Sequence, residues 1–245
     1  MRFVANTDVG KKRENNEDAY FAKEYNDEVS LYIVADGLGG YEGGEYASKI
    51  LVESISNYIE TNLKRLPKLN EVSIKNLLNV SLTMANKKIY DLEKTDKKYK
   101  GMGTTIVLLL KVKSKLFYMS VGDSRMYYIS KDFSNIEQIT IDDTYVNELI
   151  KTNVISEDEA LTHPQKHVLT KAVGILQNLT VGVNILNKDS GYIMLCSDGA
   201  TNMLSSKEIL EIFLSNNFDN LADSIITKAN GNGGIDNITV VIIEL

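Results

Sequence analysis

Aspartates at the ends of short apolar runs are the feature that most constrains the fold of this chain. There are four of them: Asp36 after residues 31–35, Asp123 after residues 116–121, Asp198 after residues 192–196, and Asp236 before residues 238–243. Apolar runs of this length are typical of buried β-strands. Four such strand ends brought together would place several carboxylates around one point.

A cluster of carboxylates needs cations, because like charges at close range repel one another. Ligands that are all oxygen favour the hard ions Mg²⁺ and Mn²⁺ over zinc or copper. Asp-Gly, which occurs at Asp36 and Asp198, is also a common turn dipeptide. The metal hypothesis therefore depends on the co-occurrence of these aspartates with further motifs.

The order of the expected elements predicts an α+β fold. Further strands are expected at residues 105–110 and 126–129, and apolar residues at helical spacing predict helices around residues 47–59 and 74–92. Capping-box pairs mark two more helix starts, at Ser156 with Glu159 and at Ser205 with Glu208. Strands and helices do not alternate regularly, which favours mostly antiparallel sheets with segregated helices.

We expect one domain over residues 1–245, because the chain has no repeat, low-complexity tract or Pro/Ser linker, and only two prolines, Pro67 and Pro164. The segment 144–174 interrupts the strands with short helical pieces. It is interpreted as a surface insert, and such inserts are often functional.

Charge and hydropathy exclude several classes of protein. The chain carries 27 Lys and Arg against 33 Asp and Glu, a net charge of -6, which argues against broad nucleic-acid binding. The single cysteine, Cys196, follows an apolar run and is predicted to be a buried, inert thiol. The N-terminus has no signal-peptide pattern, and no apolar run approaches the roughly 20 residues of a membrane helix. We therefore expect a cytoplasmic protein that binds neither nucleic acid nor membrane.

Two other motifs do not support the chemistry that they first suggest. In the glycine-rich stretch 36–44, Glu42 stands where a GxGxxG pattern needs its last glycine, and no Gly-Lys-Ser/Thr follows. Glycines there would instead let backbone carbonyls approach a metal closely. His163 and His167 have the i, i+4 spacing of a zinc helix, but Pro164 lies between them and no Glu follows His163.

Six sequence blocks, in order, resemble the type-2C metal-dependent protein serine/threonine phosphatases in their compact bacterial form. The blocks are TDVGKKRENNED (7–18), VADGLGG (34–40, followed by Gly44-Glu45), GMGTT (101–105), VGDSR (121–125), LCSDG (195–199) and DNITV (236–240). They span nearly the whole chain. The resemblance implies a four-layer α-β-β-α sandwich of two antiparallel sheets, with two metal ions, Mn²⁺ or Mg²⁺, at one end.

The resemblance also assigns roles to the metal-binding positions of this chain. Asp36 would bridge both ions, and the carbonyl of Gly37 would hold one of them. Asp198 and Asp236 would hold the other ion. Two more residues, Glu17 and Asp18, would act mainly through metal-bound waters.

Arg13 would bind the substrate phosphate, for which its fork of donors is suited. Two ions about 3.5–4 Å apart can share a water, lower its pKa and direct the hydroxide at phosphorus. This chemistry needs no protein nucleophile. Asp123 is the candidate ligand of a third, weaker ion, and residues 144–174 match the mobile flap of the family. The implied substrates are phosphoserine and phosphothreonine in proteins, those of a partner serine/threonine kinase, and we expect a monomer.

The chain departs from the family pattern near the expected site. Leu38 stands where some members carry a histidine proposed as a general acid, and Asp142-Asp143-Thr144 replaces a frequent Asp-His-Ser. His167 and Lys171 stand where Asn and Arg are common in the flap. These changes leave the expected metal ligands intact. Leu38 leaves the source of the leaving-group proton open, and the changes at residues 142–144, His167 and Lys171 leave open how the flap moves and which substrates it admits.

Two rival functions follow from the same residues. One is a scaffold that binds phosphoproteins without hydrolysing them, which the joint retention of Asp36, Asp198, Asp236 and Arg13 disfavours. A metal-dependent nuclease would need a basic, aromatic-lined surface, which the acidic composition disfavours.

Overall fold

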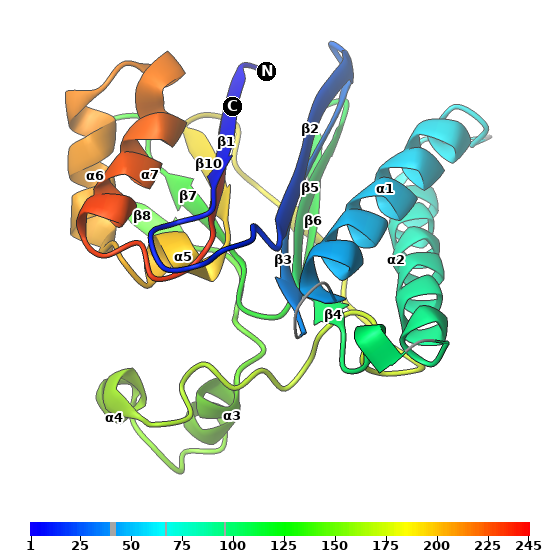
Figure 1. The fold of residues 1–245 in the computed structure, drawn as a ribbon. Coiled ribbons are helices and arrows are strands. Elements are labelled where there is room, and N and C mark those ends of the chain that lie inside the picture. Colours follow the sequence, from blue (N-terminus) through cyan, green and yellow to red (C-terminus); the bar gives the residue numbers. More distant parts are fainter. Residues whose placement is uncertain (40–42, 67, 96) are drawn as a thin grey trace.

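The computed structural model describes residues 1–39, 43–66, 68–95 and 97–245. Two antiparallel sheets lie face to face, and helices cover the outer face of each (Figure 1). This arrangement confirms the predicted α+β class and the α-β-β-α sandwich. Gly40 of the second motif and Glu42 lie outside the described residues.

The first sheet has its strands in the order β1 (Phe3–Asp8), β11 (Ile238–Glu244), β10 (Tyr192–Cys196), β7 (Arg125–Ile129) and β8 (Ile136–Gln138). The second sheet has the order β2 (Asp18–Asn26), β3 (Val29–Leu38), β5 (Ile106–Val112), β6 (Lys115–Val121) and β9 (Asn184–Leu186), with β4 (Gly103–Thr104) paired to β3. All six strands predicted from apolar runs are present. The half-buried β1 and β2 and the short β4, β8 and β9 were not predicted.

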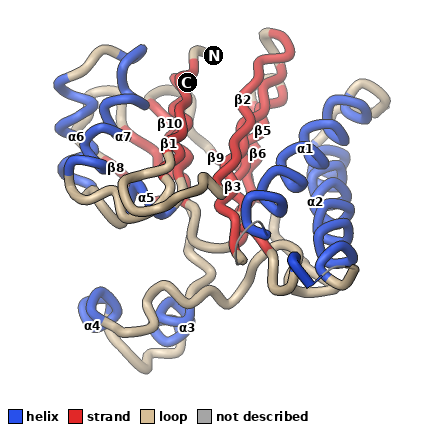
Figure 2. The backbone as a smooth tube through the Cα atoms, in the orientation of Figure 1, coloured by secondary structure: helices blue, strands red, loops and turns tan. Residues whose placement is uncertain are grey.

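Helices segregate to the two outer faces, as Figure 2 shows by colour. The second sheet is covered by α1 (Gly43–Leu63) and α2 (Glu71–Glu93), followed by the short η1 (Lys97–Tyr99). The first sheet is covered by α5 (Asp198–Thr201), α6 (Ser206–Ser215), η2 (Phe218–Asn220) and α7 (Leu221–Gly231). The predicted capping box at Ser205 and Glu208 starts α6, because each residue bonds the backbone N–H of the other.

Apolar residues form three packed layers, one between the sheets and one beneath each set of helices. In β3, Tyr32 and Val34 face the other sheet, while Leu31 and Ile33 face the helices. A strand covered on both faces can be apolar at every position, which explains why the strongest strand signals were continuous runs rather than alternating ones.

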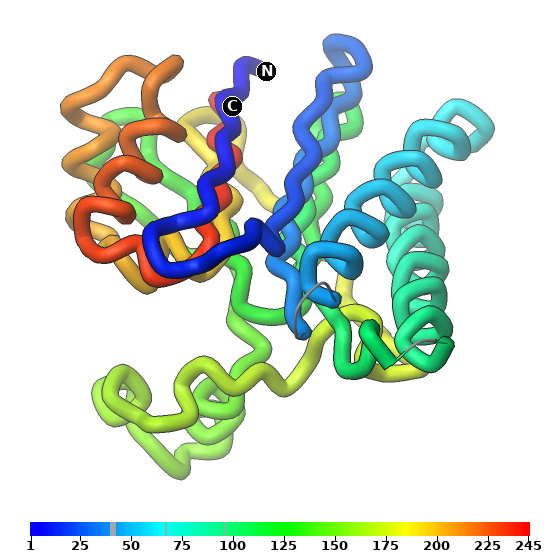
Figure 3. The backbone as a smooth tube through the Cα atoms, viewed as in Figure 1, coloured from blue at the N-terminus to red at the C-terminus, as the bar shows by residue number. Residues whose placement is uncertain are grey.

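The segment 144–174 holds α3 (Tyr145–Lys151) and α4 (Glu157–Thr162), with the predicted capping box of Ser156 and Glu159 at the start of α4. The path of the chain in Figure 3 shows this segment leaving the sandwich and returning to it. Among the described helices, none combines the length and the apolar character needed to cross a bilayer.

Candidate metal centre

Strand register brings the predicted acidic residues to one end of the sandwich. Asp18 and Asp36 lie directly opposite each other on β2 and β3. In the other sheet, Asp198 lies two residues beyond the end of β10, and Asp236 lies two residues before the start of the neighbouring β11. A pocket of about 430 Å³ opens between these strand ends.

This pocket collects nearly every site residue predicted from sequence. It is lined by Arg13, Glu17, Asp36, Gly37, Leu38, Gly39, Asp123, His167, Leu169, Asp198, Asn202, Ile235 and Asp236. Asp18 lies behind it, only 5% exposed. The structure therefore brings the predicted residues together, while the role of each stays a prediction.

The backbone of Asp36 is held by the motif of residues 103–105. Its N–H donates to Oγ1 of Thr105 at 2.9 Å, and its carbonyl accepts from Oγ1 of Thr104 at 2.9 Å. Oγ1 of Thr105 also bonds Oγ of Ser124 at 2.7 Å, the residue after Asp123. A buried chain of hydroxyl groups thus connects the position of Asp36 to the turn that carries Asp123.

Gly37 contributes only backbone atoms to the pocket, and no larger residue fits there. A Cβ at this position would lie 2.1 Å from the carbonyl oxygen of Gly44 and 2.6 Å from that of Glu17. The tight packing keeps the backbone of Gly37 against the pocket, in agreement with its predicted use of a carbonyl ligand.

Asn237 holds the N-terminal loop against the pocket. Its Oδ1 accepts from the N–H of Glu17 at 2.8 Å, and its Nδ2 donates to the carbonyls of Val9 and Asn15, both at 2.9 Å. The side chain is 4% exposed. Asn237 therefore positions the loop that presents Arg13 and Glu17, a role that the sequence analysis missed although the residue stands inside a recognised motif.

Arg13 reaches across the pocket to Asp236, with Nη2 2.8 Å from Oδ2. This hydrogen bond raises the pKa of Arg13 above its usual value, although burial opposes the shift. The side chain remains half exposed. A guanidinium so placed has further N–H groups available to a phosphate entering from solvent.

The carboxylates of the cluster resist ionisation because they are buried close together. Burial, followed by repulsion from Asp18 and Asp198, raises the pKa of Asp36 well above its usual value. Burial raises the pKa of Asp18 and of Asp123 to about 7. The pKa of Asp198 is also raised, by burial and then by the charge of Asp236. Cations at this position would remove the repulsion and favour the ionised forms.

Two buried carboxylate oxygens, Oδ1 of Asp18 and Oδ1 of Asp198, have no hydrogen-bond partner among the residues that the structure describes. Their other oxygens are engaged, by Oγ of Ser197 at 2.7 Å and by Nδ2 of Asn202 at 2.9 Å. A buried carboxylate oxygen without a donor is costly unless a cation or water satisfies it. Both atoms therefore fit a site for hard divalent ions.

The protein ligands alone do not complete such a site. Among the described residues, no three His, Cys, Asp or Glu side chains already converge closely enough to hold an ion. In addition, Arg13 binds one carboxylate oxygen of Asp236. Mg²⁺ and similar ions keep several water ligands and accept backbone carbonyls, so the all-oxygen donor set, rather than a closed cage, supports metal binding here.

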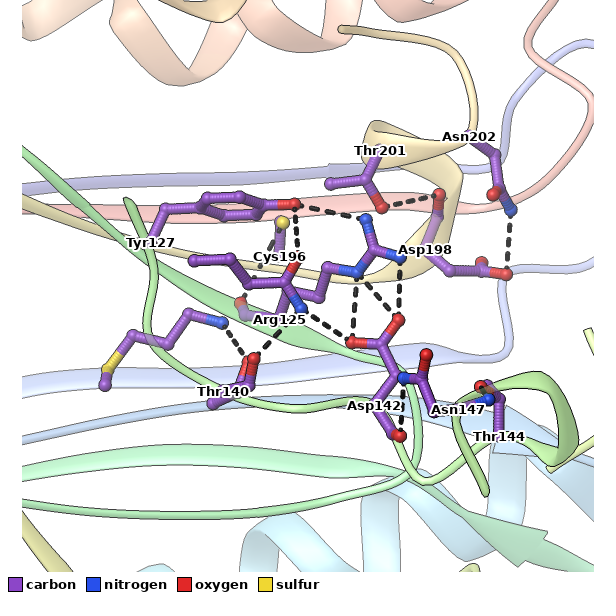
Figure 4. A network of polar contacts seen from close by, with 12 residues as sticks. Arg125, Tyr127, Thr140, Asp142, Thr144, Asn147, Cys196, Asp198, Thr201 and Asn202 are labelled. Carbon is purple, nitrogen blue, oxygen red and sulfur yellow. Dashed lines mark hydrogen bonds and ion pairs between the residues drawn. The ribbon is translucent and has the colours of Figure 1, made fainter. Parts of the chain in front are cut away.

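The flap segment joins the pocket through a polar network around Arg125, shown in Figure 4. Arg125 binds Asp142 through Nε and Nη2, at 2.9 and 2.7 Å from Oδ2, and its Nη1 donates to the hydroxyl of Tyr127 at 3.1 Å. The carbonyl of Asp142 accepts from Nδ2 of Asn147 in α3 at 2.8 Å. The pair thus connects the turn after Asp123 to the first helix of the flap.

The neighbouring Asp143 fixes both stems of the flap. Its N–H donates to the carbonyl of Gly122 at 2.8 Å, and its carbonyl accepts from the N–H of Thr170 at 2.8 Å. Its side chain forms an ion pair with Lys171 at 2.8 Å. The unusual Asp142-Asp143 pair therefore holds the base of the flap.

The two histidines have different surroundings. His163 ends α4, and its Nδ1 accepts from the N–H of Gln165 at 3.1 Å. His167 instead lines the pocket together with Leu169. Cys196 is buried, as predicted.

Similar proteins agree with the fold. The chain is 36% identical over 241 residues to "Serine/threonine phosphatase stp" of Listeria innocua, covering 97% of this chain and 93% of the relative. A solved serine/threonine phosphatase of S. agalactiae has a TM-score of 0.89 at 34% identity, covering 100% of this chain and 99% of that one. The catalytic domain of PstP, solved in complex with 2 manganese ions, has a TM-score of 0.81 at 28% identity, with 99% and 97% covered.

The sandwich, its carboxylate-lined pocket and these relatives define a metal-dependent enzyme that removes phosphate from phosphoproteins. More narrowly, the chain belongs to the protein phosphatase 2C family, whose sequence profile matches residues 9–230. The resemblance found in the six sequence blocks is thereby confirmed.

Proposed function

We propose that the pocket hydrolyses phosphoserine and phosphothreonine in other proteins with the help of two Mn²⁺ or Mg²⁺ ions. The observation that carries the proposal is the convergence of Arg13 with Asp36, Asp198 and Asp236 on one open pocket. The printed names of the relatives, serine/threonine phosphatases, support the substrate class.

In this proposal the carboxylates hold the ions. Asp36, at the centre of the cluster, would hold both ions, and the carbonyl of Gly37 would hold one of them. Asp198 and Asp236 would hold the other. When bound, the two ions supply a nucleophile by lowering the pKa of a water that they share, and they add positive charge.

The remaining residues orient water and phosphate. Glu17 lines the pocket and Asp18 lies behind it, and both would act through water ligands of the ions. Arg13 keeps its hydrogen bond to Asp236 with one N–H and turns the others to the phosphoryl oxygens, whose charge persists into the transition state. Leu38 has no proton to give. Asp123 would hold a third, weaker ion, and that ion would supply a water able to protonate the leaving group.

Several finer points belong to the same proposal. The chain acts as a monomeric single domain of residues 1–245 in the cytoplasm, with residues 144–174 as its flap. Its substrates are the products of a serine/threonine kinase. A phosphoprotein-binding scaffold without turnover is the alternative, and it shares the phosphate contact of Arg13 but not the hydrolysis.

The test is release of phosphate from matched phosphothreonine and phosphotyrosine peptides in the presence of Mn²⁺. We expect turnover of the phosphothreonine peptide to be strongly preferred, and to be lost in Asp198→Asn. The matched control is Asp189→Asn, which changes an exposed aspartate in the loop before β10. Binding of the phosphothreonine peptide without phosphate release would favour the scaffold, and equal turnover of phosphotyrosine would contradict the substrate class.

A further inference from the structure

Lysines gather where α2 ends and the chain turns toward β4. We call Lys94, Lys97, Lys98 and Lys100 the lysine turn, and all four are exposed. This concentration runs against the net charge of -6 of the whole chain. The nearest acidic side chain of α2, Glu93, is only partly exposed and its Oε1 accepts from the N–H of Gly101 at 3.1 Å. The sequence 94–100 holds these four lysines and one acidic residue, Asp96, so its net charge is +3.

The backbone of the lysine turn is anchored. The N–H of Lys100 donates to the carbonyl of Lys97 at 3.2 Å, and the N–H of Met102 donates to the carbonyl of Tyr99 at 3.0 Å. The ring of Tyr99 stacks on Tyr46 of α1, with ring centroids 5.2 Å apart, and Met102 is fully buried. The lysines thus stand on a fixed platform rather than on a loose loop.

This platform adjoins the wall of the metal pocket. Gly103 of β4 pairs with Leu38, a pocket residue. The carbonyl oxygen of Gly101 lies 3.5 Å from where a Cβ of Gly39, another pocket residue, would be. Two residues lie between Lys100 and Gly103, so the chain spans at most about 11 Å from one to the other. An extended peptide covers that distance in about three to five residues on either side of its phosphorylated residue.

We propose that the lysine turn docks an acidic segment of the phosphoprotein substrate, about three to five residues from the phosphorylated serine or threonine. The inference rests on the proposed function and adds a substrate preference to it. Exposed charges act at a distance and steer encounter, so their effect falls as salt shortens the Debye length from about 10 Å at 0.1 M to about 3 Å at 1 M. The acidic remainder of the chain makes nucleic acid a poorer occupant than a peptide of limited charge.

The experiment compares two phosphothreonine peptides of equal length, one with three Glu and one with three Gln at positions three to five from the phosphothreonine. Initial rates with Mn²⁺ give kcat/KM for wild type, for Lys97→Glu/Lys100→Glu, and for the control Lys64→Glu/Lys207→Glu. The control changes the same net charge at exposed lysines elsewhere, after α1 and in α6.

We expect wild type and the control to favour the Glu peptide by about tenfold at 50 mM salt, with the preference vanishing near 1 M. Lys97→Glu/Lys100→Glu should lose the preference while its rates on the Gln peptide and on para-nitrophenyl phosphate stay unchanged. These unchanged rates also show that the double variant is folded.

A wild type without the preference, or a preference that survives in Lys97→Glu/Lys100→Glu, would overturn the proposal. The proposal would also be overturned if neither peptide were preferred and a fluorescent oligonucleotide bound wild type but not the double variant. That result would assign the lysine turn to nucleic-acid binding. Failure of wild type to hydrolyse any of the three substrates would instead overturn the proposed function itself.

Discussion

Asp142→Asn tests how strongly the Arg125–Asp142 pair holds the base of the flap. The carboxylate is 7% exposed and the Arg125 side chain 30% exposed. Asp142 accepts two donors of Arg125 on Oδ2 and also Nε2 of Gln138 on Oδ1 at 2.9 Å. Asparagine keeps the shape of the side chain but removes its charge. Its NH₂ group would face an N–H donor of Arg125 or Gln138, where Asp142 has an acceptor oxygen.

The expected loss of stability follows from this geometry. Breaking one partner of a fully buried pair costs about 3–5 kcal/mol, and the partial exposure of Arg125 reduces this to about 2–3 kcal/mol. For a chain of this size, 1 kcal/mol shifts Tm by about 2–4 °C, so a decrease of about 4–12 °C is expected.

Thermal unfolding by circular dichroism in excess EDTA gives the Tm of wild type, Asp142→Asn, Arg125→Leu and the double variant, with Asp189→Asn as the exposed control. The double variant should be more stable than the sum of the two single losses predicts, because it leaves no unpaired buried charge. A Tm of Asp142→Asn within about 1 °C of wild type, or strict additivity in the cycle, would show that the pair does not hold the flap base in the way described.

Three further predictions concern the pocket. Burial raises the pKa of Asp18 and Asp123 to about 7, whereas unfolded aspartates titrate near about 4. The free energy of unfolding of the metal-free protein should therefore fall as pH rises from about 4 to about 7. Over the same window, the stabilisation by Mn²⁺ measured in urea titrations should grow. A stabilisation by Mn²⁺ that is independent of pH would refute this. Arg13→Ala should raise KM and lower kcat on a phosphothreonine peptide while calorimetric Mn²⁺ affinity stays within about threefold; loss of the metals would mean that Arg13 serves to orient Asp236. Asp123→Asn should keep two tight ions and lose more activity on the peptide than on para-nitrophenyl phosphate, whose leaving group needs no proton; equal losses on the two substrates would point to a role in positioning.

Sequence predicted the elements whose signal is local. The runs that became β3 and β11 are apolar at nearly every position because each strand is covered on both faces. The capping boxes at Ser156 and Ser205 are likewise complete within four residues. In contrast, β1 is an edge strand of half-buried residues, so its alternation is too weak to distinguish it from a loop.

The sequence predicted the candidate metal ligands but not the residues that hold them in place. Asp36 and Asp236 stand in recognisable motifs, but the hydrogen bonds of Asn237 join residues 220 or more positions apart. The same holds for Ser197 and Asp18, 179 positions apart. Such contacts exist only once β11 and β10 have paired beside the N-terminal loop, and no local pattern contains them.

Titration of Mn²⁺ into the chelated protein by isothermal calorimetry tests the central claim, that the strand-end carboxylates form a metal centre. We expect two tight sites per chain in wild type and in Asp189→Asn, and a loss of tight binding in Asp36→Asn, because a bridging ligand serves both ions. Phosphatase activity should return in proportion to the bound metal and should suffer more from Asp36→Asn than from any other single change. Full activity on a phosphothreonine peptide in excess EDTA, or unaltered Mn²⁺ binding by Asp36→Asn, would contradict the account.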